Sequence, residues 1–160
     1  FWWTTGMKKS LLNMYKNLIQ LRKLKGCKIV SESRRGFSAE ITLREGKYRI
    51  RLDYSVGRRP RVYMLEPEID MSSSLEIHTF GKTYHGAYKR RLPELCLTYS
   101  KYKEWNETVL LTDSYIPWAI EWTEFYELWL LTGKWYGGGI HLGEEEKTDG
   151  KDAEKNWEDT

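Results

Sequence analysis

The first strong pattern along the chain is an apolar stripe at the spacing of one helix face. Within residues 8–25, Leu11, Met14, Leu18 and Leu21 recur three or four positions apart, which places them on the same side of a helix. Three more apolar residues would widen this stripe: Leu12, Tyr15 and Ile19. A glycine follows, as is typical of a helix end. The segment therefore predicts an amphipathic helix whose lysine-rich face meets solvent.

Apolar and polar residues then alternate with the period of two that is typical of strands. The alternation covers residues 37–43, 48–54 and 62–65, and short turns containing glycine or proline separate these segments. Residues 27–33 are either an earlier strand or a connection. Short turns favour antiparallel neighbours, and the alternation leaves one apolar face to be covered. We predict an antiparallel meander with the first helix packed against it.

Residues 68–112 carry no strong period of either kind. About 45 residues without regular structure is more than a compact domain usually contains, unless the segment has a function. Cys96 lies inside it. We therefore expect an irregular segment that holds functional residues.

An aromatic stripe marks the last predicted helix. Asp113 or Ser114 could cap its start, Pro117 suits its first turn, and Gly133 is a natural end. The stripe consists of Trp118, Trp122, Phe125 and Trp129. We expect all four rings to face the core. The order of helix, antiparallel meander, irregular segment and helix predicts an α+β fold.

Charge is divided unevenly along the chain. Residues 143–160 contain eight acidic side chains and three lysines, so the preceding residues have a net charge of +8. We predict an acidic disordered tail over 143–160 and one folded domain over 8–142. Residues 1–7 are expected to be a flexible start or a non-native addition. The basic body would attract an acidic partner or nucleic acid.

Cysteine usage and hydropathy restrict the setting. The chain has two cysteines, Cys27 and Cys96, and neither a signal peptide nor an apolar run long enough for a membrane span is evident. This combination predicts reduced thiols in the cytoplasm. The sequence contains neither CxxC nor HxxxH, so we expect no metal and no cofactor. Cys27 is expected to be structural.

Several motifs together resemble the ubiquitin-conjugating family. Residues 60–67, Pro-Arg-Val-Tyr-Met-Leu-Glu-Pro, resemble the strand that leads to that family's active-site segment, and Leu95-Cys96-Leu97 resembles its catalytic cysteine. Residues 116–122, Ile-Pro-Trp-Ala-Ile-Glu-Trp, and residues 135–141, Trp-Tyr-Gly-Gly-Gly-Ile-His, resemble the bacterial branch of the family. Members of that branch occur in CBASS antiphage defence operons beside a cGAS-like nucleotidyltransferase. The resemblance covers roughly residues 11–141 and implies the ubiquitin-conjugating fold.

The resemblance also implies a reaction. Cys96 would hold the carboxyl end of a protein as a thioester, and that protein would be the nucleotidyltransferase. The acyl group would then pass to a lysine or another amine, which primes antiphage signalling. The sequence has no glycine motif of the adenylating type, so the carboxylate must be activated elsewhere or the reaction differs from the ubiquitin pathway.

Two histidines are candidates to assist Cys96 by orienting the carbonyl or moving a proton. The eukaryotic family places His-Pro-Asn about ten residues before its cysteine, and this motif is absent here. His85 lies eleven residues before Cys96, whereas His78, in Ile-His-Thr-Phe, resembles the bacterial Pro-His-x-Tyr motif without its proline. The sequence leaves the choice open.

A reactive cysteine needs a lowered pKa, which nearby positive charge supplies. The basic residues closest in sequence to Cys96 are Lys89, Arg90, Arg91, Lys101 and Lys103. The residues expected to contact a partner are Tyr88, Arg90, Arg91, Tyr99 and His141.

Two other functions compete with catalysis. The chain could be a non-catalytic binding module of the same fold, in which Cys96 is a small buried apolar residue. It could instead bind nucleic acid through its basic turns, but no nucleic-acid motif accompanies them, so this partner is not expected.

Overall fold

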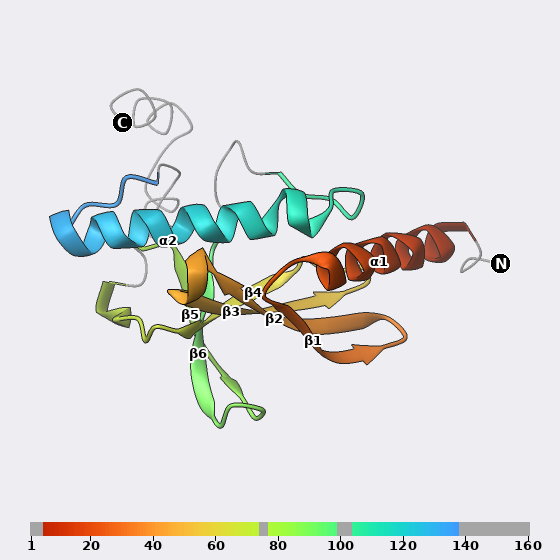
Figure 1. The fold of residues 1–160 in the computed structure, drawn as a ribbon, viewed down its shortest axis with the longest axis horizontal. Coiled ribbons are helices and arrows are strands. Elements are labelled where there is room, and N and C mark those ends of the chain that lie inside the picture. The colour runs from red at the N-terminus through yellow and green to blue at the C-terminus, as the bar shows by residue number, and fades with distance from the viewer. Residues whose placement is uncertain (1–4, 74–76, 99–103, 138–160) are drawn as a thin grey trace, which may run out of the picture.

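The computed structural model describes residues 5–73, 77–98 and 104–137, and these form two helices and one sheet (Figure 1). The helices and strands are α1 Thr5–Lys23, β1 Cys27–Ser33, β2 Gly36–Leu43, β3 Tyr48–Ser55, β4 Arg61–Glu66, β5 Thr79–His85, β6 Arg90–Leu95 and α2 Tyr115–Thr132. The six strands pair antiparallel in the order β1-β2-β3-β4-β6-β5. Both helices lie on one side of the sheet, and the β5–β6 hairpin extends from the other side (Figure 1). This α+β arrangement is consistent with the ubiquitin-conjugating fold.

The central meander matches its prediction because the alternation decides which face of each strand is buried. Ala39 pairs with Leu52, and Ile41 pairs with Ile50. All four side chains are at most 1% exposed and face the helices. The segment that could have been a strand or a connection, residues 27–33, is strand β1.

The first helix forms as predicted, but its buried face is narrower than expected. Met14, Leu18 and Leu21 are buried. The three residues expected to widen the stripe are half exposed or more: Leu12, Tyr15 and Ile19. The prediction for these three was wrong because α1 packs mainly against the edge strand β1 and the short turn at Leu111–Asp113. A helix covered along one narrow line leaves the neighbouring apolar positions in solvent.

The irregular segment predicted over 68–112 contains the β5–β6 hairpin, so that prediction was wrong in part. The sequence pattern did not indicate this hairpin because β5 lies at the sheet edge and has little buried surface. Phe80, Lys82 and Tyr84 are all exposed, and Pro93 interrupts the pattern of β6. Strands without a buried face do not show the alternation on which the prediction relied.

Helix α2 lies between Ser114 and Gly133, which has φ 73°, so its bounds match the prediction, but the Ser114 side chain makes no capping hydrogen bond. Of the aromatic stripe, however, only Trp122 is buried, and Trp118, Phe125 and Trp129 are half-buried. The buried face is shifted and includes Tyr115, Ile116, Ala119, Trp122 and Tyr126. Because the helix is apolar nearly all round, its sequence alone does not specify which side meets the sheet.

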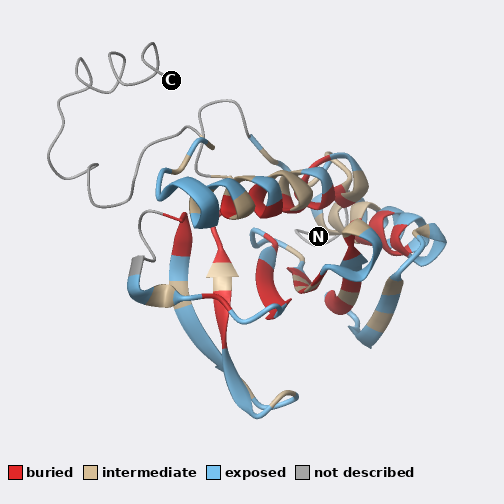
Figure 2. Cartoon of the chain, turned by 60° about the vertical axis from the view of Figure 1, so that its left-hand side comes forward, coloured by how far each residue is buried: buried red, intermediate tan, exposed pale blue. Residues whose placement is uncertain are grey.

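The other face of the sheet carries a small apolar cluster of its own. Tyr63, Leu65 and Leu92 are buried there, and Tyr88 packs against them. In Figure 2, buried residues lie along the side of α2 that faces the sheet, whereas the tip of the β5–β6 hairpin is exposed. No helix in the described ranges is long and apolar enough to cross a membrane.

Candidate functional site around Cys96

Cys96 lies directly after β6, beside His78. Thr79 pairs with Leu95 in the β5–β6 ladder, and the backbone N–H of Cys96 donates a 2.9 Å hydrogen bond to the carbonyl oxygen of His78. The pairing therefore continues by one residue and places His78 opposite Cys96. Cys96 is 5% exposed, so its surroundings must open before a protein substrate can reach the sulfur.

Two tryptophans hold His78 in place. The imidazole stacks on Trp135, with ring centroids 5.4 Å apart and planes at 18°. Trp122 donates its Nε1 hydrogen to the carbonyl oxygens of Ile77 at 2.9 Å and His78 at 3.3 Å. The backbone of His78 has φ 53°, a left-handed conformation that is uncommon outside glycine. Strained backbone of this kind persists only where the surrounding contacts compensate for it, and both indoles contribute to that here.

His85 lies at the opposite end of the hairpin. It pairs with Arg90, and its ring packs edge-on against Tyr63 with centroids 4.3 Å apart. Its Nε2 is buried, and nothing in the described ranges hydrogen-bonds to it. Burial lowers the pKa of this imidazole. The register of the hairpin thus brings His78 to Cys96 and does not bring His85.

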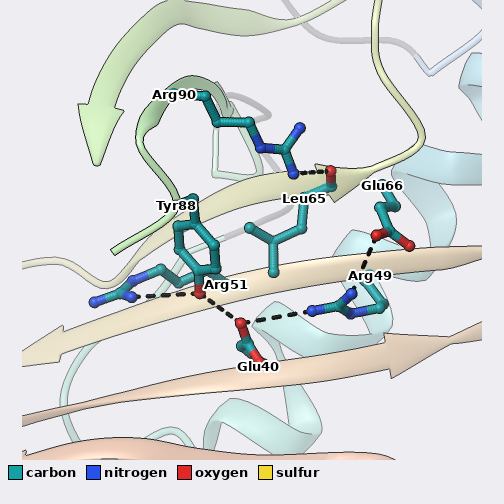
Figure 3. Close-up of polar contacts among 7 residues, drawn as sticks. All are labelled: Glu40, Arg49, Arg51, Leu65, Glu66, Tyr88 and Arg90. Carbon is teal, nitrogen blue, oxygen red and sulfur yellow. Dashed lines mark hydrogen bonds and ion pairs between the residues drawn. The ribbon is translucent and has the colours of Figure 1, made fainter. Parts of the chain in front are cut away.

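The basic residues near Cys96 in sequence are not near it in space. Arg90 and Arg91 pair with His85 and Tyr84, at the hairpin end that is about 17 Å of strand away from Cys96. Arg90 donates instead to the carbonyl oxygen of Leu65 at 2.6 Å (Figure 3). The expectation that Lys89, Arg90 and Arg91 surround the thiol was therefore wrong, because the hairpin carries them away. Lys101 and Lys103 lie outside the described residues.

The hairpin tip is bound to the outer face of the sheet. The Tyr88 hydroxyl donates to Glu40 at 2.7 Å and accepts from Arg51 at 3.4 Å, and Arg49 bridges Glu40 and Glu66 (Figure 3). Of the residues predicted to contact a partner, Tyr88 and Arg90 thus make contacts within the fold. Arg91 is exposed at the hairpin, and Tyr99 and His141 lie outside the described residues.

A cleft of about 450 Å³ lies next to the segment that holds Cys96, although Cys96 itself is not among its lining residues. We call it the arginine cleft, because Arg58, Arg59 and Arg61 line it from the β3–β4 turn and the start of β4. The remaining lining residues are Asp53, Ser55, Pro60, Tyr63, Phe80, Glu94, Leu95, Leu97, Thr98 and Tyr115. The two neighbours of Cys96 in the chain are both among them. This turn therefore places positive charge on the cleft that both neighbours of Cys96 line.

The polar side chains nearest to Cys96 form a short chain at the rim of the arginine cleft. Arg59 donates to the Thr98 hydroxyl at 2.9 Å, and Thr98 hydrogen-bonds with Tyr115. The pKa of Tyr115 is raised to about 12, chiefly by burial and to a smaller extent by negative charge on Cys96 and Glu94, while Arg59 and the Thr98 hydrogen bond lower it. At neutral pH the Tyr115 hydroxyl is therefore protonated.

The arginine cleft also contains two carboxylates, Asp53 and Glu94. Burial raises the pKa of the Glu94 carboxyl, and the positive charge of Arg61 partly opposes that effect. Its negative charge is therefore less favourable than that of a solvated glutamate. No group of three or more His, Cys, Asp and Glu side chains in the described ranges could hold a metal ion.

Sequence reasoning did not assign four residues to this site, although three of them belong to the basic turns that were considered for nucleic-acid binding. Arg58, Arg59 and Arg61 surround Pro60, the first residue of the motif strand, and their position at the start of that strand was a usable signal. Tyr115 precedes the helix motif by one residue and carried no signal, because only packing places the start of α2 against the segment after Cys96.

Comparison with known proteins supplies the family. The family model described as type II CBASS E2 protein matches residues 15–142, which include the second half of α1, all six strands, Cys96 and α2. No curated protein matches the chain. Since the match extends over most of its length, the chain belongs to the type II CBASS E2 family.

Proposed function

We propose that this protein carries the carboxyl end of another protein as a thioester on Cys96 and transfers it to an amine. The Cys96 thiolate attacks the carbonyl carbon of an activated carboxyl group, a carbon–sulfur bond forms, and the activating group leaves. The acceptor amine then attacks the same carbon, an amide forms, and the thiolate is released. The proposed donor is the C-terminus of a cGAS-like nucleotidyltransferase, and the proposed acceptor is a lysine-bearing protein.

The observation that carries this proposal is that Cys96 pairs with His78 while both of its chain neighbours line the arginine cleft. Positive charge from that cleft would favour the thiolate, and the cleft offers space for a peptide once the 5%-exposed cysteine becomes accessible. His78 is the histidine that we propose assists the reaction, because its backbone bonds to that of Cys96. The Tyr115 hydroxyl is the donor that we propose for the developing oxyanion, in place of the absent asparagine.

The burial of Cys96, which is 5% exposed, favours a second candidate function. A non-catalytic module of the same fold would bind the nucleotidyltransferase through this surface and use the cysteine only for packing. Such a module would retain binding and cellular function after Cys96→Ala. The thioester carrier would lose its function.

The two functions are separated by mixing the protein with the nucleotidyltransferase of its own operon, supplied with its C-terminal carboxyl group already activated as a thioester. The thioester carrier should give an adduct on Cys96 that is detected both on a non-reducing gel and by intact mass spectrometry. Hydroxylamine should cleave this adduct. Cys27→Ser is the matched control and should retain the adduct, while Cys96→Ala should lose it. Binding without an adduct in the wild-type protein would favour the non-catalytic module.

A further inference from the structure

We propose that the arginine cleft binds the residues that precede the acylated carboxyl end of the donor, and that it selects donors with acidic side chains there. This inference rests on the proposed function and specifies the substrate class for it. Nothing in the family match assigns a charge to the donor.

Position is the first argument. A peptide joined to Cys96 must leave the sulfur along the neighbouring surface, and Leu95 and Leu97 on either side of Cys96 both line the arginine cleft. The volume of about 450 Å³ is within the range of ligand-binding pockets. Cys96 itself does not line the cleft, so the peptide passes over Leu95 or Leu97 once the 5%-exposed cysteine is accessible, and the side chains before the acylated residue then meet the cleft lining.

Charge is the second argument. Within the described ranges none of the three cleft arginines forms an ion pair, and Arg58 and Arg61 are exposed. Of the two acids, Asp53 is already occupied by Arg51 at 2.8 Å and Ser38 at 2.7 Å, and Glu94 is half-buried. Guanidinium groups bind carboxylates with paired hydrogen bonds, so the cleft favours glutamate or aspartate.

The positive charge of the three arginines also indicates whether the acyl donor or the acceptor amine binds in the cleft. An acceptor lysine approaches with its ammonium group protonated, and the three arginines repel it. The cleft therefore suits the donor rather than the amine. Phe80, which is 53% exposed, and Tyr115 also line it, so an apolar side chain beside the acidic ones would contact these rings.

The test uses two synthetic peptide thioesters with mercaptoethanesulfonate as the leaving group. The peptides share their last residues and differ only in carrying two glutamates or two lysines before them. The Cys96 sulfur attacks the thioester carbonyl, the new thioester forms, and mercaptoethanesulfonate leaves, so the reaction needs no other activating enzyme. Intact mass with peptide mapping gives the rate of acylation at Cys96. We expect the acidic peptide to react about tenfold faster at low salt, and this advantage to shrink at high salt.

The variants assign the preference to the cleft. Arg58→Glu combined with Arg61→Glu should abolish or reverse the preference, and Arg58→Glu alone should reduce it. Arg34→Glu combined with Arg35→Glu is the matched control, since it changes the net charge equally in the exposed β1–β2 turn and should keep the preference. Circular dichroism checks that each variant remains folded.

Binding is measured separately, by fluorescence anisotropy of the same two sequences as free acids with Cys96→Ser protein. Tighter binding of the acidic peptide that depends on Arg58 and Arg61 supports the inference even if acylation is slow. Equal binding overturns it, as does a preference that survives the double arginine variant. Failure of both peptides to acylate Cys96, with the acidic preference in binding intact, would count against the proposed thioester chemistry alone.

Discussion

Trp135 stacks on His78, with ring centroids 5.4 Å apart and planes at 18°, although 57 positions separate them in the chain. Trp135 also contacts Trp122 and Phe125 of α2. The segment after α2 therefore closes over the residue that pairs with Cys96 and connects the end of the helix to the candidate site.

Removing this ring should loosen the site. Trp135→Ala is expected to lower the free energy of unfolding by about 2 kcal/mol, because a half-buried indole loses its aromatic contacts. Urea denaturation measures this value. Trp135→Phe keeps a ring on His78 and should recover much of the loss. An alanine variant as stable as the wild type would show that the stack contributes nothing.

Asn17 connects α1 to the turn before α2. Its side-chain oxygen accepts from the Leu111 N–H at 2.8 Å, and its amide donates to the Asn13 carbonyl oxygen at 2.9 Å. Asn17→Leu leaves a buried N–H without an acceptor and should cost about 1–3 kcal/mol of unfolding free energy. Asn13→Ala, which keeps the main-chain carbonyl, is the control and should cost clearly less. Equal losses in a thermal or urea titration would contradict this role.

The hydroxyl of Tyr88 holds the hairpin tip against the sheet through Glu40 and Arg51. Tyr88→Phe should reduce global stability by only about 1 kcal/mol. It should accelerate hydrogen exchange at the tip of the β5–β6 hairpin, because the tip then opens locally. Tyr84→Phe removes a hydroxyl from an exposed ring on the same hairpin and should leave exchange unchanged. Identical exchange in both variants would overturn the prediction.

His85 should make stability depend on pH. Burial lowers its pKa below the ordinary value of 6.5, so the folded protein takes up this proton at lower pH than the unfolded chain does. Between the two pKa values the unfolded chain binds more protons, and stability is therefore lost as the pH falls below about 6.5. His85→Gln removes this contribution. The stability of the variant relative to the wild type should rise between about pH 7.5 and about pH 5 in urea titrations. A constant difference would contradict the prediction.

Elements that depend on neighbouring residues were predictable from local patterns in the sequence. The stripe of Met14, Leu18 and Leu21 predicted α1, the alternation over residues 37–54 predicted β2 and β3, and Gly133 marked the end of α2. Local periodicity is sufficient for these elements because each buries one regular face. The motifs around Cys96 indicated the family in the same way, since they are runs of adjacent residues.

The surroundings of Cys96, in contrast, depend on strand pairing and on packing between distant segments. Pairing of β5 with β6 places His78 opposite Cys96 and takes His85 and Arg90 to the other end of the hairpin. Packing of the β3–β4 turn then brings Arg59 to Thr98. Strand register and turn packing join residues that are far apart in sequence, and an exposed edge strand has no alternation from which its register can be predicted. Distance along the chain was therefore a poor guide to which charges and which histidine lie beside the sulfur.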